Sequence, residues 1–221
     1  MTRPTAVGIL ISVCALTSAA QSGNQQIEPK AGQWPPPRYG PPLSQESRRL
    51  TRGCSEPLRV EPLGSGHDRS GFESGVEPLD RYFRTQAGQD ARKNMAAPFV
   101  LVLQDGTIAG YYTLSSTSVQ LGELPDKTVR KLPRYPLVPA TLLGRLAVDR
   151  RQQGKGYGRF LLADALYRAV RSEIASFAVI VDAKDENARR FYERESFLPF
   201  PDQPMKLFRP MADIRRLFDG P

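Results

Sequence analysis

The feature that most constrains this chain is the stretch RLAVDRRQQGKGYGRFLLADAL, residues 145–166. An almost entirely apolar run, residues 141–149, predicts a buried strand. A turn containing three glycines follows, and an apolar stripe at helical spacing then predicts a helix over residues 156–171. A second apolar run, residues 176–183, predicts another buried strand. Strand, helix and strand in this order imply a right-handed crossover between two parallel strands.

The remaining pattern predicts a mixture of short helices and strands around this unit. Residues 75–96 suggest one or two short helices, and residues 99–116 a hairpin that turns at Asp105-Gly106. Residues 117–140 are rich in proline and charge and predict an irregular connector with at most a short helix. A helix is expected over residues 186–196 with Asp185 as its N-cap, and a last strand over residues 205–211.

The first 56 residues differ from the rest. They begin with Arg3, an apolar run and small residues, the pattern of a secretory signal peptide. A segment rich in Pro, Gly, Gln and Ser follows and predicts disorder. Three interpretations compete: an export signal, a disordered cytosolic extension, or a start site placed too far upstream. A single globular domain is expected over residues 57–221.

Composition narrows the chemistry that the chain can perform. Both cysteines, Cys14 and Cys54, lie in the N-terminal extension, and His67 is the only histidine. The globular part therefore has no cysteine nucleophile, disulfide or cysteine-bound metal, and no metal site is expected. A net charge of +8 fits either solubility alone or a polyanionic partner.

The glycine turn is suited to an anion. Gly154, Gly156 and Gly158 lie where the strand passes into the helix, and the first turn of a helix carries unpaired N–H groups at the positive end of its dipole. Glycine removes the Cβ that would hold a phosphate away from them. The spacing fits neither a P-loop nor a dinucleotide fingerprint. The alternative is a tight turn with no ligand.

The residues Arg151-Gln152-Gln153-Gly154-Lys155-Gly156 resemble the acyl-CoA pyrophosphate loop of the GCN5-related N-acetyltransferase (GNAT) family. With YYTLSS, LPRYPLVPATLLGRLAVD, FYE and MKLFRPM in order, the chain resembles the toxin branch of that family, over roughly residues 58–214. The resemblance implies an α/β GNAT fold, a mixed central sheet flanked by helices on both faces. It also implies acetyl-CoA as the acyl donor.

The resemblance also assigns roles to residues. The backbone of the strand before the loop would pair with the pantetheine arm, and the loop N–H groups would bind the pyrophosphate. Tyr192 would hydrogen-bond or protonate the sulfur of the leaving thiolate. Asn187 would bind pantetheine, or be only a helix-start residue; Tyr192 could instead be only a half-buried aromatic. The full cofactor-binding set is Leu146, Ala147, Val148, Arg151, Gln153, Gly154, Lys155, Gly156, Tyr157, Gly158 and Asn187.

The acceptor remains open at this stage. No base is placed by motif, which favours an α-amine, with a pKa near 7.7–8.0, over a lysine. The toxin resemblance implies aminoacyl-tRNA, a ribbon-helix-helix antitoxin and a cytoplasmic location without membrane contact, with a homodimer as one option. Because these substrates are cytosolic, the export signal is discounted, and residues 1–56 are interpreted as a disordered extension or a misplaced start. Candidate RNA contacts are Arg81, Arg84, Arg92, Lys93 and Arg145.

Two alternatives accompany this interpretation. One keeps the enzyme but changes the acceptor to a small-molecule or protein amine. The other is a non-catalytic acyl-CoA-binding regulatory module. One departure from the family stands out, because Ser196 occupies a position near the end of the FYE helix where the family often has glycine.

Overall fold

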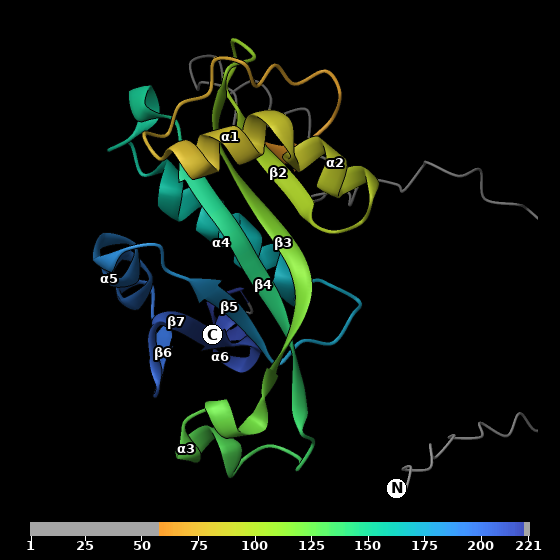
Figure 1. Ribbon diagram of the computed structural model, residues 1–221, viewed down its shortest axis with the longest axis vertical. Coiled ribbons are helices and arrows are strands. Elements are labelled where there is room, and N and C mark those ends of the chain that lie inside the picture. The colour runs from red at the N-terminus through yellow and green to blue at the C-terminus, as the bar shows by residue number, and fades with distance from the viewer. Residues whose placement is uncertain (1–57, 219–221) are drawn as a thin grey trace, which may run out of the picture. The chain divides into compact units, whose positions relative to one another are not determined.

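The computed structural model describes residues 58–218, which contain one mixed sheet of seven strands with helices on both faces (Figure 1). The expectations for residues 1–56, and the two cysteines, lie outside the described residues. The strand order is β1-β2-β3-β4-β5-β7-β6. The strands are β1 Arg59–Pro62, β2 Ala97–Val102, β3 Ile108–Gln120, β4 Leu137–Val148, β5 Ala178–Asp182, β6 Leu198–Phe200 and β7 Gln203–Pro210.

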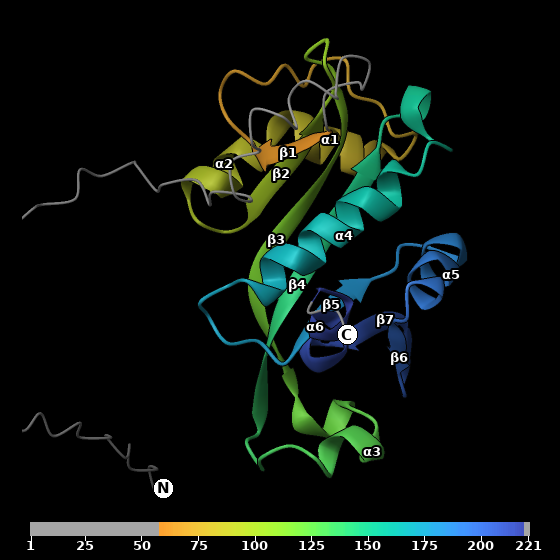
Figure 2. The ribbon, with the colours of Figure 1, turned by 180° about the vertical axis from the view of Figure 1, so that it is seen from behind.

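The helices divide between the two faces of the sheet. Helices α1 and α2 cover one face of β2–β4, and α4 and α6 cover the other, as the two opposite views show (Figures 1 and 2). The short helix α3 lies at the far end of the long β3–β4 pair. The bounds are α1 Glu77–Thr85, α2 Ala87–Arg92, α3 Asp126–Val129, α4 Tyr157–Val170, α5 Glu186–Arg194 and α6 Met211–Phe218, with short 3-10 turns η1 Leu121–Glu123 and η2 Arg150–Gln152.

The expected crossover unit is confirmed. β4 and β5 pair in parallel, and α4 connects them. The expected hairpin is also present as β2 and β3, with Gly106 at a φ of 81° in its turn. Asp185 caps α5 through a 2.8 Å bond from the Ala188 N–H. None of the helices among residues 58–218 has the length and apolar character needed to span a bilayer.

The connector predicted over residues 117–140 is wrong at both ends. β3 continues to Gln120 and β4 begins at Leu137, so the two strands extend together into a long arm. Residues 121–136 close the arm through a hydrogen bond from the Leu121 N–H to the Pro136 carbonyl. The sequence interpretation also missed β1, β6 and α6, and Met211 begins α6 instead of ending a strand.

Two glycines shape the β3–β4 pair, one where α4 approaches it and one at a bulge. A Cβ on Gly110 would lie 2.7 Å from the Ala147 carbonyl oxygen and 2.7 Å from Leu161 Cδ1, so this position requires glycine. Gly144 sits where the β3–β4 register shifts by one residue, which is a β-bulge. The bulge bends β4 just after its last pairing with β5 and so prepares the fork between the two strands.

Candidate active site

The fork between β4 and β5 is the first element of the site. Their pairing ends at Leu143 and Val181, whereas β4 continues to Val148. The Asp149 N–H donates to the Ala109 carbonyl, so the alternation of an antiparallel ladder turns Ala147 toward β3 and the backbone groups of Leu146 and Val148 away from it. β4 therefore offers the N–H and C=O groups of Leu146 and the N–H of Val148 to an extended ligand, while the Val148 carbonyl accepts a bond from the Gln153 side chain.

The glycine turn is the second element. Gly154 and Gly156 have φ of 78° and 83°, in the left-handed region that favours glycine, and a Cβ on either would meet nothing within 4 Å. Gly156 is the N-cap of α4. Among the described residues, no hydrogen bond uses the N–H groups of residues 154–158. An open ring of unpaired N–H groups at a helix N-terminus is a binding site for phosphate.

Asp149 holds the start of this turn in place. Its side chain is buried and accepts bonds from the Arg151 N–H, the Arg151 guanidinium and the Glu73 N–H at 2.9–3.2 Å. The bond from Arg151 is the main reason that the pKa of Asp149 is lowered. Arg151, expected to contact the ligand, thus has its guanidinium bound to Asp149 and to the Gly71 carbonyl.

The other loop side chains divide between scaffold and open surface. Gln153 donates its amide to the carbonyls of Ser74 and Val148 at 2.9 and 3.1 Å, which ties the turn to the end of β4. Lys155 is exposed and donates to the Gln152 side chain at 2.8 Å. Tyr157 and Gly158 open α4 with their N–H groups directed out of the helix. The backbone of the turn, more than its side chains, is available to a ligand.

Helix α5 supplies the third element. Asn187 lies in its first turn, is exposed, and has no partner for its side chain within residues 58–218. Tyr192 is only 8% exposed and belongs to the same core cluster as Leu143 and Val181, the last β4–β5 pair. Burial raises the pKa of the Tyr192 phenol, so it stays protonated well above neutral pH. Tyr192 is thus a proton-bearing donor in the core cluster that also contains the last β4–β5 pair, and it is more deeply buried than the sequence suggested.

A Schellman motif fixes the backbone of Tyr192. The Phe197 N–H donates to the Tyr192 carbonyl and the Ser196 N–H to the Glu193 carbonyl, both at 3.0 Å. The rings of Tyr192 and Phe197 lie 5.5 Å apart, which is the hydrophobic contact that accompanies the motif. Ser196 takes the left-handed position, with a φ of 63°. The departure noted in the sequence therefore leaves the geometry intact but places a Cβ in a strained conformation.

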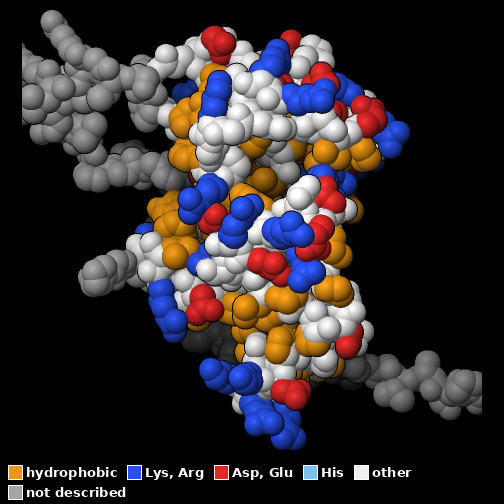
Figure 3. Space-filling view, turned by 90° about the vertical axis from the view of Figure 1, so that its left-hand side faces the viewer, with side chains coloured by type: hydrophobic (Ala, Val, Ile, Leu, Met, Phe, Trp, Pro, Cys, Tyr) orange, Lys and Arg blue, Asp and Glu red, His pale blue; other side chains and the backbone are white. Residues whose placement is uncertain are grey.

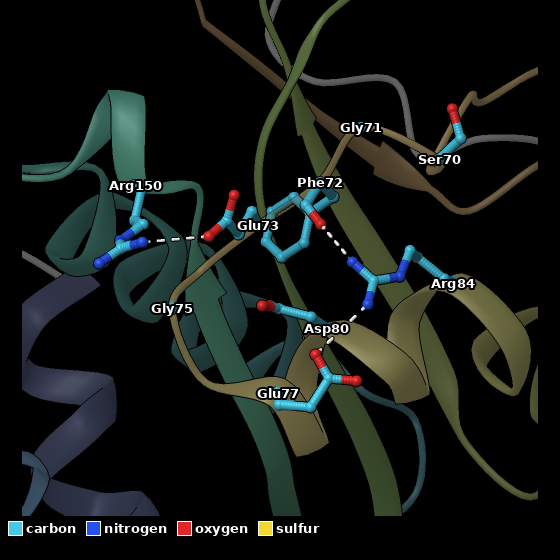
Figure 4. A pocket seen from close by; sticks show the side chains of 9 residues that line it. All are labelled: Ser70, Gly71, Phe72, Glu73, Gly75, Glu77, Asp80, Arg84 and Arg150. Atoms are coloured by element: carbon cyan, nitrogen blue, oxygen red, sulfur yellow. Dashed lines mark hydrogen bonds and ion pairs between the residues drawn. The ribbon is translucent and has the colours of Figure 1, made fainter.

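A pocket of about 460 Å³ lies between the segment 70–75, α1 and η2 (Figure 4). Its walls carry the carboxylates of Glu73, Glu77 and Asp80, which disfavour a phosphate. Arg84, expected to contact RNA, lines this pocket and donates to the Phe72 carbonyl at 3.0 Å, with Glu77 3.5 Å from its guanidinium. None of residues 154–158 lines this pocket, so it is distinct from the glycine turn.

The other candidate RNA contacts lie on α1, α2 and β4. Arg81, Arg92 and Lys93 are exposed and form no ion pair within the described part of the chain. Arg145 stacks its guanidinium over the Tyr82 ring at 3.5 Å. These cations lie on the face of the sheet that α1 and α2 cover. Arg84 differs from the others because its guanidinium is bound to the Phe72 carbonyl and lies near Glu77.

His67 is not available as a base. Its Nδ1 accepts the Gly64 N–H at 2.9 Å, and its Nε2 lies 2.9 Å from Glu61, so both ring nitrogens are engaged in the loop after β1. Within residues 58–218 no cluster of His, Cys, Asp and Glu could hold a metal ion.

Comparisons with known proteins agree with this geometry. The family model described as "Acetyltransferase (GNAT) family" matches residues 68–197. This chain belongs to the GNAT family of acetyltransferases. A tRNA-acetylating toxin from Mycobacterium tuberculosis is 37% identical over 167 residues, which cover 75% of this chain and 97% of that protein. A probable toxin TacT from Sinorhizobium fredii is 31% identical over 72% of this chain and 93% of that protein.

Solved structures give the same result for the fold. AtaT complexed with acetyl-methionyl-tRNAfMet has a TM-score of 0.68 at 30% identity, and covers 73% of this acetyltransferase and 99% of the AtaT chain. A Tyr-to-Phe mutant of KacT has a TM-score of 0.69 at 29% identity, with 73% and 99% covered. The GNAT fold expected from the sequence is therefore confirmed.

Sequence reasoning missed one residue of this acetyltransferase that shapes the donor site. Asp149 organises the turn, yet its sequence signal is only a carboxylate that ends an otherwise apolar strand. Such a residue is costly to bury unless several donors surround it. A carboxylate at the end of an apolar strand therefore indicates a residue that several donors surround, and this was the sequence signal for the anchoring role of Asp149.

Proposed function

We propose that this enzyme transfers the acetyl group of acetyl-CoA to the α-amino group of aminoacyl-tRNA, and so acts as the translation-inhibiting toxin of a toxin–antitoxin module. The observation that carries the proposal is the match to the tRNA-acetylating toxin of M. tuberculosis over 97% of that protein. AtaT, which shares the fold over 99% of its chain, has been solved with acetyl-methionyl-tRNAfMet.

The donor site follows from the fork and the turn. The backbone groups of Leu146 and the N–H of Val148 would pair with the amide groups of pantetheine as a missing strand would. The N–H groups of residues 154–158, with the positive end of the α4 dipole behind them, would bind the pyrophosphate. Asn187 would add a side-chain bond to pantetheine from the other side of the fork. Lys155 adds positive charge beside the phosphates.

Tyr192 would assist the departure of the thiolate. The amine nitrogen attacks the thioester carbon, the C–N bond forms and the C–S bond breaks. The attacking nitrogen gives up one proton to solvent as the amide forms. The leaving sulfur takes the proton of the Tyr192 hydroxyl, and the phenolate regains a proton from solvent, so the products are neutral and Tyr192 is restored. Because burial raises the pKa of this phenol, it enters each cycle protonated. General-acid assistance of this kind contributes on the order of 10²–10⁴-fold in rate.

An α-amine suits a site without a dedicated base. With a pKa near 7.7–8.0, an appreciable share of such an amine is neutral at physiological pH. His67 is engaged elsewhere, and the acidic pocket between α1 and η2 is separate from the fork. An amine that needs no base is therefore the acceptor that this site favours.

The remaining parts of the proposal concern partners and location. Arg81, Arg92, Lys93 and Arg145 would contact tRNA phosphates, with a smaller role for Arg84. AtaT has been solved with the C-terminus of its antitoxin AtaR, which supports an antitoxin partner here, of the ribbon-helix-helix class. Acetyl-CoA and charged tRNA are cytosolic, so the enzyme would act in the cytoplasm.

The test follows labelled acetyl from acetyl-CoA into a pool of aminoacyl-tRNAs with wild type and Tyr192→Phe. We expect label on tRNA, and a kcat at least 100-fold lower in the variant, with an unchanged Kd for acetyl-CoA, because only a hydroxyl is lost. Label that appears on a small amine or a protein but never on tRNA would overturn the acceptor assignment. Equal kcat values would remove Tyr192 from the chemistry.

A further inference from the structure

A second group of cations lies at the end of the β3–β4 arm, away from the residues considered so far. Lys127 lies in α3, and Arg130, Lys131 and Arg134 follow in the turn and irregular chain between α3 and β4. All four side chains are exposed, and none forms an ion pair or hydrogen bond within residues 58–218. We call these four residues the arm cluster.

The arm cluster sits on a well-anchored platform. Leu124 is buried, and Val129 and Leu132 pack against the core formed by Val119 and its neighbours. A 3.2 Å bond between Lys206 and Glu123 ties the base of the arm to β7 and neutralises Glu123. The apolar side of the segment is thus fixed, and the basic side is left to solvent. In Figure 3, Lys and Arg side chains gather at the lower end of the molecule, where Figure 1 places α3.

The arm cluster shares a face of the sheet with the cations near the fork. Tyr111, which packs under α1, and Val119, which packs under α3, are both odd-numbered positions of β3, so they point to the same face. Arg145 pairs with Thr113 and therefore lies on this face too, between the two ends. From Thr113 to Val119 the strand rises by about 20 Å, at roughly 3.3 Å per residue.

The surface between the two basic ends is polar and contains small side chains. Ser115 and Thr117 lie on this face of β3, between Arg145 and α3, and are partly exposed. Hydroxyls are common donors to phosphate and ribose oxygens in nucleic-acid interfaces. Cations at both ends, with hydroxyls between them, match an extended polyanion of regular charge better than a compact anion.

We propose that the arm cluster binds the phosphate backbone of the tRNA acceptor arm, so that the RNA lies along this face of the sheet with its charged 3′ end at the fork. The inference rests on the proposed acceptor and adds a contact surface about 20 Å from Arg145. The arm cluster contributes affinity and orientation, and none of its members takes part in the chemistry. Its contacts are insensitive to base sequence.

The experiment compares the full-length enzyme with a variant carrying Lys127→Gln, Arg130→Gln, Lys131→Gln and Arg134→Gln. Binding of deacylated tRNA is measured between 50 and 300 mM salt, and KM for aminoacyl-tRNA at one salt concentration. Each phosphate contact adds about 0.7–0.9 to the slope of log K against log salt. We expect the slope to fall by about 3 and KM to rise at least tenfold, with kcat and the Kd for acetyl-CoA unchanged.

A control of equal charge change removes four exposed cations elsewhere, through Arg59→Gln, Arg171→Gln, Arg215→Gln and Arg216→Gln. It should leave the salt slope within about 1 of wild type. Arm and control variants with the same slope and KM would overturn the proposal. So would an arm variant that binds tRNA normally but loses self-association or binding to an acidic antitoxin segment. If wild type acetylates no tRNA, the proposed function fails, whereas loss of the arm effect alone leaves it standing.

Discussion

Ser196 offers a direct test of how the end of α5 is built. Its φ of 63° places an L-residue in the left-handed region, at a cost of about 1–2 kcal/mol. The side chain is exposed and forms no hydrogen bond within the described residues, so Ser196→Gly removes strain without removing a contact. Glycine also gains freedom in the unfolded chain, worth about 0.5–1 kcal/mol. The net expectation is a gain of about 0.5–1 kcal/mol in the free energy of unfolding.

Thermal unfolding followed by circular dichroism measures this gain. For a domain of this size, 1 kcal/mol corresponds to a shift of about 2–4 °C in Tm, so we expect a rise of about 1–4 °C. Ser196→Ala is the matched control, because it keeps the Cβ and should give no rise. An alanine variant stabilised as much as the glycine variant would refute the argument, since the gain could not then come from relief of backbone strain.

Two further predictions concern Gly110, where α4 approaches β3, and Asp149, which anchors the glycine turn. Gly110→Ala should lower the free energy of unfolding by about 2 kcal/mol or more, because the added Cβ would lie 2.7 Å from the Ala147 carbonyl oxygen. Urea denaturation measures this change. An unchanged free energy of unfolding would contradict the tight approach of α4 to β3. Asp149→Asn should cost about 1–2 kcal/mol at pH 7 through weaker bonds to Arg151 and the Glu73 N–H. The folded-state pKa of Asp149 is lowered, so its contribution is present above the unfolded pKa of about 3.9 and is lost as the pH falls through the folded value. The stability difference from wild type should therefore shrink below about pH 4; an equal difference at pH 7 and pH 3 would argue against the carboxylate as its source.

The central crossover and the binding turn were predictable because their signals are local. Apolar runs set the two parallel strands, and the spacing of Gly154 and Gly156 predicted an open turn that the positive φ values confirm. The N-cap at Asp185 was equally local. Each of these features depends on residues that are close in sequence.

The β3–β4 arm could not be predicted in the same way. Pro136 and Pro139 read as strand breakers, yet Pro139 pairs with Ser118 inside β4. The bond from the Leu121 N–H to the Pro136 carbonyl sets the alternation, which turns the nitrogen of Pro139 away from β3. No N–H is required on that side, so proline is tolerated there. Which side a nitrogen faces depends on the register with a distant strand, and local pattern does not contain that information.

The partners of the charged side chains could not be predicted from the sequence either. Arg84 and Arg151 looked like ligand contacts by type and place, but tertiary partners use their guanidinium groups. The burial of Tyr192 depends on Phe197 and on the fork, which come together only in the folded domain.

The position of Tyr192 limits how this enzyme can lose its activity. Its ring fills space in the main core and its backbone carbonyl closes the end of α5, while only its hydroxyl is assigned to the reaction. Truncation to alanine would therefore also open a cavity, at a cost of about 3–5 kcal/mol for a large aromatic. Phenylalanine is the substitution that separates the two roles. Under the proposed mechanism, removal of this single oxygen atom should abolish catalysis while the ring continues to fill the core.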